Sequence, residues 1–403
     1  MNTKYCFLIG FIVLLSCACS QQKSQEKYLE SVIRRLEKIQ SATYLERRET
    51  WNPYDSDPVY DMQFYINAYD NPQDTTIGAS TIEFHADDTT HFRFAYDGKA
   101  RILVSDEDKK LVIDSFKFNK ELPFRLVNPP FYNYTKNIIN YMLTTTDSIT
   151  IEQAESYHAN HFKLTIHEDR QVEFFGKAFK IPTPPMNGED PTSVYEIWID
   201  KKTNLPYKVR REMSHNISQT TVSDSVFNLI SIRDFNPADY FPADYKIVYY
   251  REASTIQRNS SLEKAPAPGF TLFDTRNNQI SLQEIESEVV LLHFTGIGCG
   301  PCLLSIPFLE QVHNTYPEEK VSVLSIETWN SKEKTMRNYQ TKHEFTFPFL
   351  KSDDYIAENY KIAGVPAFFI IDKNKTIRKI FNGYDENNSD RLIQEYIDEL
   401  LKE

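Results

Sequence analysis

Two cysteines stand three positions apart at the end of an apolar run, in the stretch VVLLHFTGIGCGPCLLSIPFLEQVH over residues 289–313. The run VVLLHF is apolar throughout, as expected for a central strand that is covered on both faces. A helical pattern begins directly after it. The sequence therefore predicts a strand that passes into a helix, with Cys299 and Cys302 on one side of the first turn and close enough to bond each other.

The expected position of Cys299 at a helix N-terminus favours redox chemistry. Unpaired N–H groups and the helix macrodipole stabilise a thiolate there, and a thiolate is the attacking species in thiol–disulfide exchange. Cys302 is then placed to attack the mixed disulfide and release the product. A zinc site would need further cysteines or suitable histidines, so no metal is expected. An inert structural bridge is the other alternative. No organic cofactor is expected, because no Gly-rich phosphate-binding loop is present.

The first residues, MNTKYCFLIGFIVLLSCACS, are typical of a bacterial lipoprotein signal peptide. One Lys precedes an apolar core that is too short to span a bilayer. The stretch LLSC at 14–17 resembles a lipobox, which predicts lipidation of Cys17, with Cys19 as the alternative. A plain signal peptide with incidental cysteines would also fit. We therefore expect an envelope protein of a Gram-negative bacterium, anchored by lipid and facing the periplasm.

Composition limits the classes of partner. The chain has 403 residues, which favours two domains. Its formal net charge of −12 argues against a nucleic-acid surface or a polybasic membrane patch. Of its five cysteines, only Cys299 and Cys302 lie beyond the leader. An exported protein stabilised by disulfides would have several spaced pairs, so this pair is expected to serve chemistry.

Hydrophobic patterning divides the chain into four parts: a leader at 1–19, a β-rich α+β domain at 20–251, a polar linker at 252–264 and an α/β domain at 265–403. The first domain shows strand-like alternation. Helices are expected at 26–40 and within 128–143, where the helix starts after the proline pair. After the linker, short apolar strands alternate with helical stretches.

The last part resembles the thioredoxin superfamily, and more narrowly the membrane-anchored TlpA/ResA-type thiol-disulfide oxidoreductases. CGPC has the inner dipeptide of thioredoxin, Pro307 matches the helix-kinking proline of the family, and GVPAFFIID carries the Val365–Pro366 bond. The resemblance implies a mixed central sheet with helices on both faces. It also implies that this bond is cis and that Pro366 faces the cysteines and shapes the groove for a partner backbone.

Three positions depart from the family pattern. Gly298 stands where a Trp usually precedes the first cysteine, and Ser305 replaces a Glu of the ResA type. The buried acidic residue of thioredoxin aligns with His293, which could take the proton of Cys302 or could simply be a packed core histidine. The peroxiredoxin pattern places Thr three residues before the cysteine, whereas Thr295 lies four before Cys299, so thiol peroxidase is a lesser alternative.

The first domain more weakly resembles the LolA/LolB-like periplasmic domains, which would make it a half-barrel around apolar helices. Tyr132, Tyr134 and Tyr141 could line a lipophilic groove or form the hydrophobic plug under the sheet. His158, His161 and His167 are the only histidine concentration that we identify in the sequence. Strand geometry separates 161 from 167 by roughly 20 Å, so a shared metal is not expected.

These features predict an oxidoreductase that reduces disulfides of exported proteins, with Cys299 as nucleophile, Cys302 as resolving cysteine, and Pro366 and His293 beside them. The family resemblance implies a membrane electron donor of the DsbD type. The alternative is an envelope protein that binds a lipophilic ligand or a protein partner through its first domain, with a modulatory redox domain.

Overall fold

The protein is described here from a computed structural model. The description covers residues 23–52, 55–106, 108–117, 127–181, 191–214, 216–250, 259–329, 331–353, 355–385 and 388–403. The expected leader, both candidate lipidation sites Cys17 and Cys19, and residues 252–258 of the expected linker lie outside these residues.

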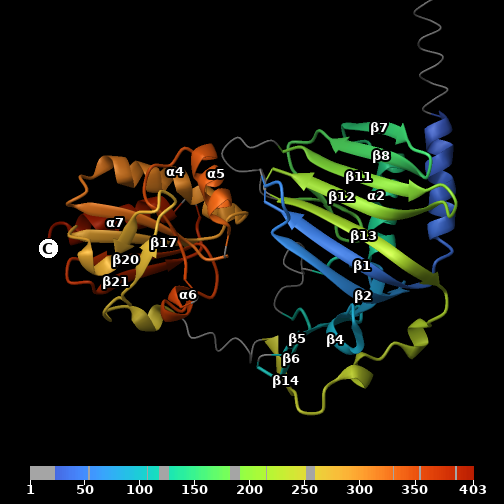
Figure 1. Ribbon diagram of the computed structural model, residues 1–403, viewed down its shortest axis with the longest axis horizontal. Coiled ribbons are helices and arrows are strands. Elements are labelled where there is room, and N and C mark those ends of the chain that lie inside the picture. Colours follow the sequence, from blue (N-terminus) through green and yellow to red (C-terminus); the bar gives the residue numbers. More distant parts are fainter. Residues whose placement is uncertain are drawn as a thin grey trace, which may run out of the picture.

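Twelve of the described strands form one sheet in the first part of the chain (Figure 1). Their order is β14-β6-β5-β4-β3-β2-β1-β13-β12-β11-β8-β7, and all pairs are antiparallel except β14 with β6. The sheet is open and does not close into a barrel. The strands are β1 (Ser41–Trp51), β2 (Tyr60–Asp70), β3 (Ala79–His85), β4 (Asp88–Tyr96), β5 (Arg101–Ser105), β6 (Lys110–Asp114), β7 (Ile149–Glu155), β8 (Ala159–Ile166), β11 (Ser193–Asp200), β12 (Leu205–Met213), β13 (Asn216–Phe227) and β14 (Lys246–Tyr249). A small hairpin of β9 (Val172–Phe174) and β10 (Ala178–Lys180) is separate.

Two helices pack on this sheet, at 23–36 and at α2 (Phe131–Thr144). Alternate residues of β11 are fully buried, among them Tyr195 and Ile197, as period-two patterning requires. They share one core with apolar residues of both helices. The helix expected within 128–143, after the proline pair, begins at Phe131 with Pro130 as its N-cap, as predicted. A residue that precedes a proline is disfavoured in helical conformation, so the helix does not start earlier.

The last part of the chain holds a five-stranded mixed sheet in the order β19-β18-β17-β20-β21. β17 pairs in parallel with β18 and antiparallel with β20. The elements are β15 (Thr271–Phe273), β16 (Gln279–Ser281), β17 (Val289–Thr295), α4 (Gly300–Thr315), β18 (Val321–Glu327), α5 (Glu333–Lys342), β19 (Phe349–Lys351), α6 (Ile356–Asn359), β20 (Ala367–Asp372), β21 (Ile377–Asn382) and α7 (Ser389–Leu400). The thioredoxin-like mixed sheet with helices is therefore confirmed.

The burial of strand β17 shows that this sheet is covered on both faces. All seven of its residues are buried. Val289 and Leu291 pack with apolar residues of α4 and α7, whereas Val290 and Leu292 pack with α6 and the β15–β16 hairpin. A continuous apolar run is what a strand with two buried faces needs. Among the described helices, none has both the length and the apolar character needed to cross a membrane.

Candidate active site

The cysteine pair lies where β17 gives way to α4. Cys299 is the N-cap of α4, and its Sγ accepts a hydrogen bond from the backbone N–H of Cys302 at 3.2 Å. The two residues form a disulfide of 2.05 Å with their Cα atoms 5.3 Å apart. Cys299 is 8% exposed, and Cys302 is 0% exposed. The two sulfurs are thus unequal: a partner disulfide reaches Cys299 first, and the helix N-terminus supports negative charge on its sulfur.

The loop before β20 (Ala367–Asp372) lies against this sulfur. The carbonyl oxygen of Val365 is 3.7 Å from Cys299 Sγ, and the Val365–Pro366 peptide bond is cis. Pro366 is buried, and its carbonyl accepts the N–H of Gly383 at 2.8 Å. The structure therefore places the cis Val365–Pro366 bond at the loop that contacts Cys299 through the Val365 carbonyl. The carbonyl of Val365 in this loop lies next to the sulfur of Cys299, which is the more exposed of the two cysteines. That Pro366 shapes a groove for a partner backbone stays a prediction.

A buried carboxylate that the sequence analysis missed holds the loop before Cys299. Glu327 ends β18 and is fully buried. One of its oxygens accepts backbone N–H groups of Ile297 at 3.4 Å and Trp329 at 3.1 Å, and the other accepts that of Ser331 at 2.9 Å. Because these donors come from two loops, Glu327 ties the loop that carries the cysteines to the loop after β18.

The second missed residue is Trp329, which is 55% exposed and packs over Gly296 beside the cysteine loop. Gly298 has φ = 91°, a left-handed conformation that strongly disfavours a bulky side chain. A Trp directly before the first cysteine, as in the family, would be strained in this backbone. An indole is nevertheless present beside the site, supplied by the loop after β18.

His293 is 1% exposed in the middle of β17. Its Nδ1 lies 2.8 Å from Ser325 Oγ and its Nε2 lies 3.4 Å from Ser305 Oγ, while its ring stacks on Phe368. Burial lowers its pKa to about 3, so the ring is neutral at neutral pH. Ser305 donates to the carbonyl of Cys302 at 2.8 Å. These contacts satisfy a packed core histidine, and a proton relay from Cys302 stays a hypothesis.

The histidine concentration identified in the sequence does not gather into a site. His161 Nε2 lies 2.8 Å from Glu196, and His167 Nε2 lies 2.9 Å from Thr150. These three are therefore not the only concentration of histidines, because sheet pairing brings His85 and His91 together. The nitrogens of His85 and His91 and a carboxylate oxygen of Asp106 lie within 4.8 Å of one another.

The side chains of His85, His91 and Asp106 already interact with one another and with Tyr245. Asp106 Oδ1 lies 2.8 Å from His91 Nε2 and accepts the hydroxyl of Tyr245 at 2.7 Å. His85 and His91 stack edge to face, with ring centroids 5.3 Å apart. Two imidazoles and a carboxylate suit a transition metal. The trio belongs to the first domain, on β3, β4 and the residue after β5, and it has no part in the cysteine site.

The three tyrosines of the first domain take different roles. Tyr132 and Tyr141 are buried and donate to Ser225 Oγ and Asp147, each at 2.7 Å. Tyr134 packs against the same core, donates to Glu173 at 3.0 Å and lines a cavity. The plug under the sheet therefore accounts for two of them, and Tyr134 alone faces an open space.

Comparisons with known proteins place the similarity in the last part of the chain. Residues 264–380 match the AhpC/TSA family. The thiol-disulfide oxidoreductase ResA of Geobacillus kaustophilus is 26% identical over 136 residues, which is 32% of this chain and 78% of that protein. ResA of Bacillus subtilis is 24% identical over 141 residues, covering 35% and 76%.

A solved structure from Chlorobium tepidum, described as a thiol:disulfide interchange protein DsbE, is 21% identical, with a TM-score of 0.33. It covers 34% of this chain and 97% of that one. The C-terminal part has a thioredoxin-like fold, is distantly similar to the thiol-disulfide oxidoreductase ResA, and holds Cys299 and Cys302 in CXXC spacing. Each of these matches covers about a third of the chain.

Proposed function

We propose that the chain is an exported, lipid-anchored oxidoreductase that reduces disulfides of periplasmic proteins in a Gram-negative cell envelope. The unequal burial of the cysteine pair carries this proposal: Cys299, at a helix N-terminus, keeps 8% of its surface exposed, whereas Cys302 has none. The names of the similar proteins, thiol-disulfide oxidoreductases, support the reaction class. The leader sequence supports export and an anchor at Cys17, or at Cys19.

The reaction needs only the two thiols and a substrate disulfide. The Cys299 thiolate attacks one substrate sulfur, which forms a mixed disulfide and releases the other substrate sulfur as a thiolate. Cys302 then attacks Cys299 Sγ, so the mixed disulfide breaks and the substrate leaves as a dithiol. The substrate gains two electrons and the protein becomes the disulfide. A dithiol donor in the membrane, of the DsbD type, must reduce it again.

The direction of reaction follows from the residues between the cysteines. Gly300 and Pro301 match the inner dipeptide of thioredoxin, which has a reduction potential of roughly −270 mV, against about −120 mV for a strongly oxidising periplasmic enzyme. We therefore place this protein among reductants. Equilibration of the dithiol with glutathione or dithiothreitol buffers measures the potential directly.

Trapping tests the proposal. The reduced Cys302→Ser variant should hold periplasmic proteins on Cys299 through mixed disulfides that dithiothreitol releases, and the matched Cys299→Ser variant should hold none. In the insulin assay the wild-type chain should reduce disulfides and both variants should not. Capture by Cys299→Ser at the same level, or insulin reduction without Cys299, would reject the assignment.

Lipid attachment needs its own experiment. Radiolabelled palmitate should enter the wild-type chain in a Gram-negative host and be lost in Cys17→Ser. If Cys19→Ser loses the label instead, the anchor is at Cys19. If both variants keep the label of the wild type, neither cysteine is the anchor.

The match to the AhpC/TSA family makes thiol peroxidase the alternative within the same fold. The position three before Cys299 is Gly296, which packs under Trp329 and has no hydroxyl to offer a peroxide. Thr295, one residue earlier, is buried and its carbonyl accepts from Thr328. We therefore expect hydrogen peroxide consumption by the reduced protein to be no faster than that by a free dithiol.

A further inference from the structure

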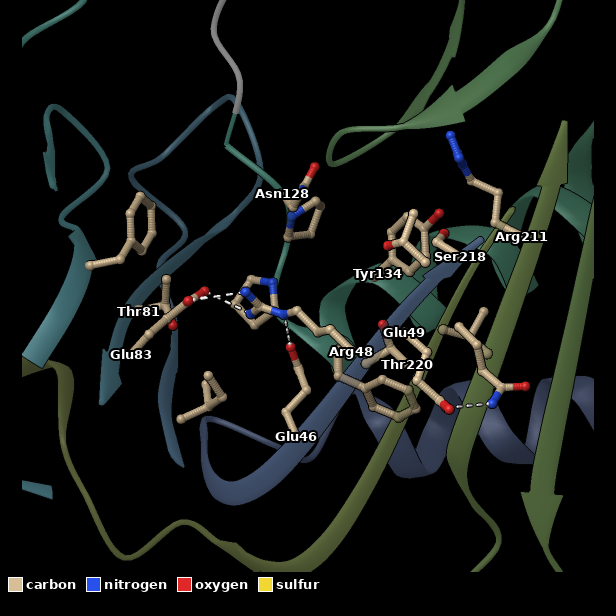
Figure 2. Close-up of a pocket in the computed structure, with 18 of the residues that line it drawn as sticks. Glu46, Arg48, Glu49, Thr81, Glu83, Asn128, Tyr134, Arg211, Ser218 and Thr220 are labelled. Atoms are coloured by element: carbon tan, nitrogen blue, oxygen red, sulfur yellow. Dashed lines mark hydrogen bonds and ion pairs between the residues drawn. The ribbon is translucent and has the colours of Figure 1, made fainter. Parts of the chain in front are cut away.

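The first domain has a cavity of about 680 Å³, bounded by strands of the large sheet and by the N-terminal end of α2. This volume lies within the range of small-molecule sites, roughly 300–1,000 Å³. Figure 2 shows Tyr134 and Arg211 on one side of the cavity and Glu83 with Thr81 on the other. None of its lining residues belongs to the thioredoxin-like domain.

Most charges in the cavity wall are fixed in ion pairs. Arg48 donates two hydrogen bonds to Glu83, at 3.0 and 2.7 Å, and contacts Glu46 through its Nε (Figure 2). Arg211 pairs with Glu173 at 2.8 Å. Each of these carboxylates is paired with an arginine, so none of them is an unpaired negative charge that would favour a cationic ligand.

Glu49, the remaining carboxylate of the wall, is also satisfied. It lies 3.1 Å from the guanidinium of Arg47 and accepts the side-chain amide of Gln219 at 2.8 Å. Among the described residues, every lining carboxylate therefore has a cationic partner. The wall thus offers a ligand no carboxylate that lacks a counter-charge.

Arg93 on β4 differs from the other two arginines of the wall. Its Nη1 is buried and has no hydrogen-bond partner in the described part of the chain. Its guanidinium lies 4.8 Å from the ring centroid of Phe64, the same ring over which Arg48 lies at 4.8 Å. Two guanidinium groups thus share one aromatic ring, but the carboxylates Glu46 and Glu83 are bound to Arg48 alone.

A buried guanidinium N–H without an acceptor is unfavourable, because the group has lost water and gained nothing in exchange. Stacking on Phe64 holds the plane of the group but leaves its N–H donors free. Nη1 itself is enclosed, but Arg93 lines the cavity and no described carboxylate pairs with its guanidinium. An anion in the cavity would lie beside this charge, and a planar carboxylate or a phosphate matches the fork of donors.

The wall beside Arg93 is apolar. Phe94, its neighbour on β4, pairs across the strands with Leu103, and Val104 follows on β5. Leu103 is 37% exposed, so part of this apolar wall is open to a ligand. A ligand with an apolar body attached to its acidic head would cover this wall and reach Arg93 at the same time.

We propose that this cavity binds a small anionic amphiphile, with its acidic head on the guanidinium of Arg93 and its apolar body on Phe94 and Leu103. A long acyl chain fits less well, because it would lie over the Arg48 ion pairs and remove water from them without hydrogen bonds. The first domain would then be a ligand-binding domain, and this role does not depend on the cysteines.

Two dyes with the same aromatic body test the proposal on the full chain. 1-Anilinonaphthalene-8-sulfonate carries an anionic group that N-phenyl-1-naphthylamine lacks. Fluorescence titration should show one site that prefers the anionic dye. In Arg93→Gln, affinity for the anionic dye should fall about tenfold, the loss expected for one charge-assisted contact. Affinity for the neutral dye should not change.

Three controls make the result specific. Arg93→Lys keeps the charge and should retain much of the preference, and Arg210→Gln removes a neighbouring cation outside the cavity and should change nothing. Insulin reduction and thermal unfolding of Arg93→Gln show whether the variant is folded. Equal affinity of the wild type for both dyes, or equal losses in Arg93→Gln and Arg210→Gln, would overturn the proposal.

Competition identifies the head group. Octanoate and octyl phosphate at equal concentration each compete with the dye, and the stronger competitor shows whether the site prefers a carboxylate or a phosphate. Either preference supports the site if it disappears in Arg93→Gln. Displacement by octanol as strong as that by both acids would overturn the role of Arg93.

Discussion

The indole of Trp329 lies directly on Gly296: a Cβ added at position 296 would be 2.4 Å from the ring. No real side chain tolerates such a distance, so the ring and the glycine depend on each other. Gly296 is also the residue whose carbonyl accepts the N–H of Cys299, at 3.1 Å. The contact therefore connects an exposed aromatic side chain to the loop that carries the nucleophile.

Substitution of Gly296 by Ala should displace the indole of Trp329 into solvent. The chain has three tryptophans, so Trp51→Phe and Trp198→Phe should first be made to leave Trp329 as the only emitter. In that background we expect Gly296→Ala to shift the emission to longer wavelength and to slow insulin reduction severalfold. The rate with a small aromatic disulfide should change little, because only a protein substrate is large enough to use the indole as a contact surface.

Gly364→Ala is the matched control, because a Cβ there meets no atom within 4 Å. It should leave both the emission and the insulin rate unchanged. An unshifted emission in Gly296→Ala would show that the ring does not lie on the glycine in solution. Equal slowing with the small disulfide would show that the effect is on the cysteines and not on substrate contact.

Glu327 should be a positioning residue for the cysteine loop. Glu327→Gln replaces one carboxylate oxygen by an amide donor, which leaves a buried backbone N–H of Ile297, Trp329 or Ser331 without an acceptor. The cost of such a group is about 1–3 kcal/mol of unfolding free energy. We also expect the amide of Ile297 to exchange with solvent faster and the alkylation rate of reduced Cys299 to change.

Glu288→Gln is the control for this prediction, since Glu288 makes only an exposed pair with Lys320 and such pairs contribute about 0–1 kcal/mol. If Glu327→Gln leaves the exchange rate of Ile297 unaltered, the carboxylate does not hold the loop. A loss of stability with unchanged exchange and alkylation would assign it a purely structural role.

The sequence predicts those parts of the cysteine site whose residues lie close together in the chain. An apolar run, two cysteines and a helical period follow one another within 289–313, and each constrains the next. Glu327 and Trp329 were missed because they are distant in sequence from the pair. Parallel pairing of β17 with β18 sets Thr295 opposite Glu327, and only this brings the carboxylate under the cysteine loop. The one available signal was that Glu327 ends an apolar strand, at the sheet edge where parallel strands place functional groups.

The first domain shows the same limit more strongly. Alternation predicted its strands, but not that β1 pairs with β13, so that Trp51 lies opposite Ile217. Such non-local register depends on packing of whole faces and not on any short segment. The alternation pattern does not single out Arg48 or Arg93. The structure instead directs both into one cavity, on the ring of Phe64.

Removal of Arg48 should destabilise the large sheet. Arg48→Met leaves the buried Glu46 and the half-buried Glu83 without their cation. Loss of one partner of a fully buried ion pair costs about 3–5 kcal/mol. The side chain of Arg48 is 35% exposed, so we expect a cost below that range. Burial already raises the pKa of Glu46 and Arg48 opposes this rise, so the pKa rises further in the variant. A carboxyl group whose pKa is higher in the folded than in the unfolded state favours the folded state at low pH, and this contribution is lost as pH rises. The loss of unfolding free energy in Arg48→Met should therefore be smaller near pH 5 than at pH 8.

Urea unfolding followed by the emission of Trp51 and Trp198, which both lie in the first domain, measures this effect in a Trp329→Phe background. The variant Glu46→Gln/Arg48→Met/Glu83→Gln has no buried charge at these positions and should recover most of the stability. A defect that is independent of pH, or that persists in the triple variant, would mean that Arg48 acts through its packing on Phe64.

The last prediction concerns the neutral state of His293. Its folded pKa of about 3 lies below the ordinary value of 6.5, so below pH 6.5 the unfolded chain binds a proton that the folded chain does not. The unfolding free energy of the thioredoxin-like domain should therefore fall as pH drops from 6.5 towards 3, by roughly 1.4 kcal/mol per pH unit for this one group.

His293→Gln keeps a neutral polar side chain but cannot titrate, so the difference between the variant and the wild type isolates the effect. Urea unfolding at pH 7.5 and pH 5, followed by the emission of Trp329 alone, should show a steeper decline in the wild type by about 2 kcal/mol. Equal slopes would mean that folding does not lower the pKa of His293. The same two proteins test the relay: an identical pH profile of insulin reduction would exclude His293 as the acceptor of the Cys302 proton, because Gln cannot take one.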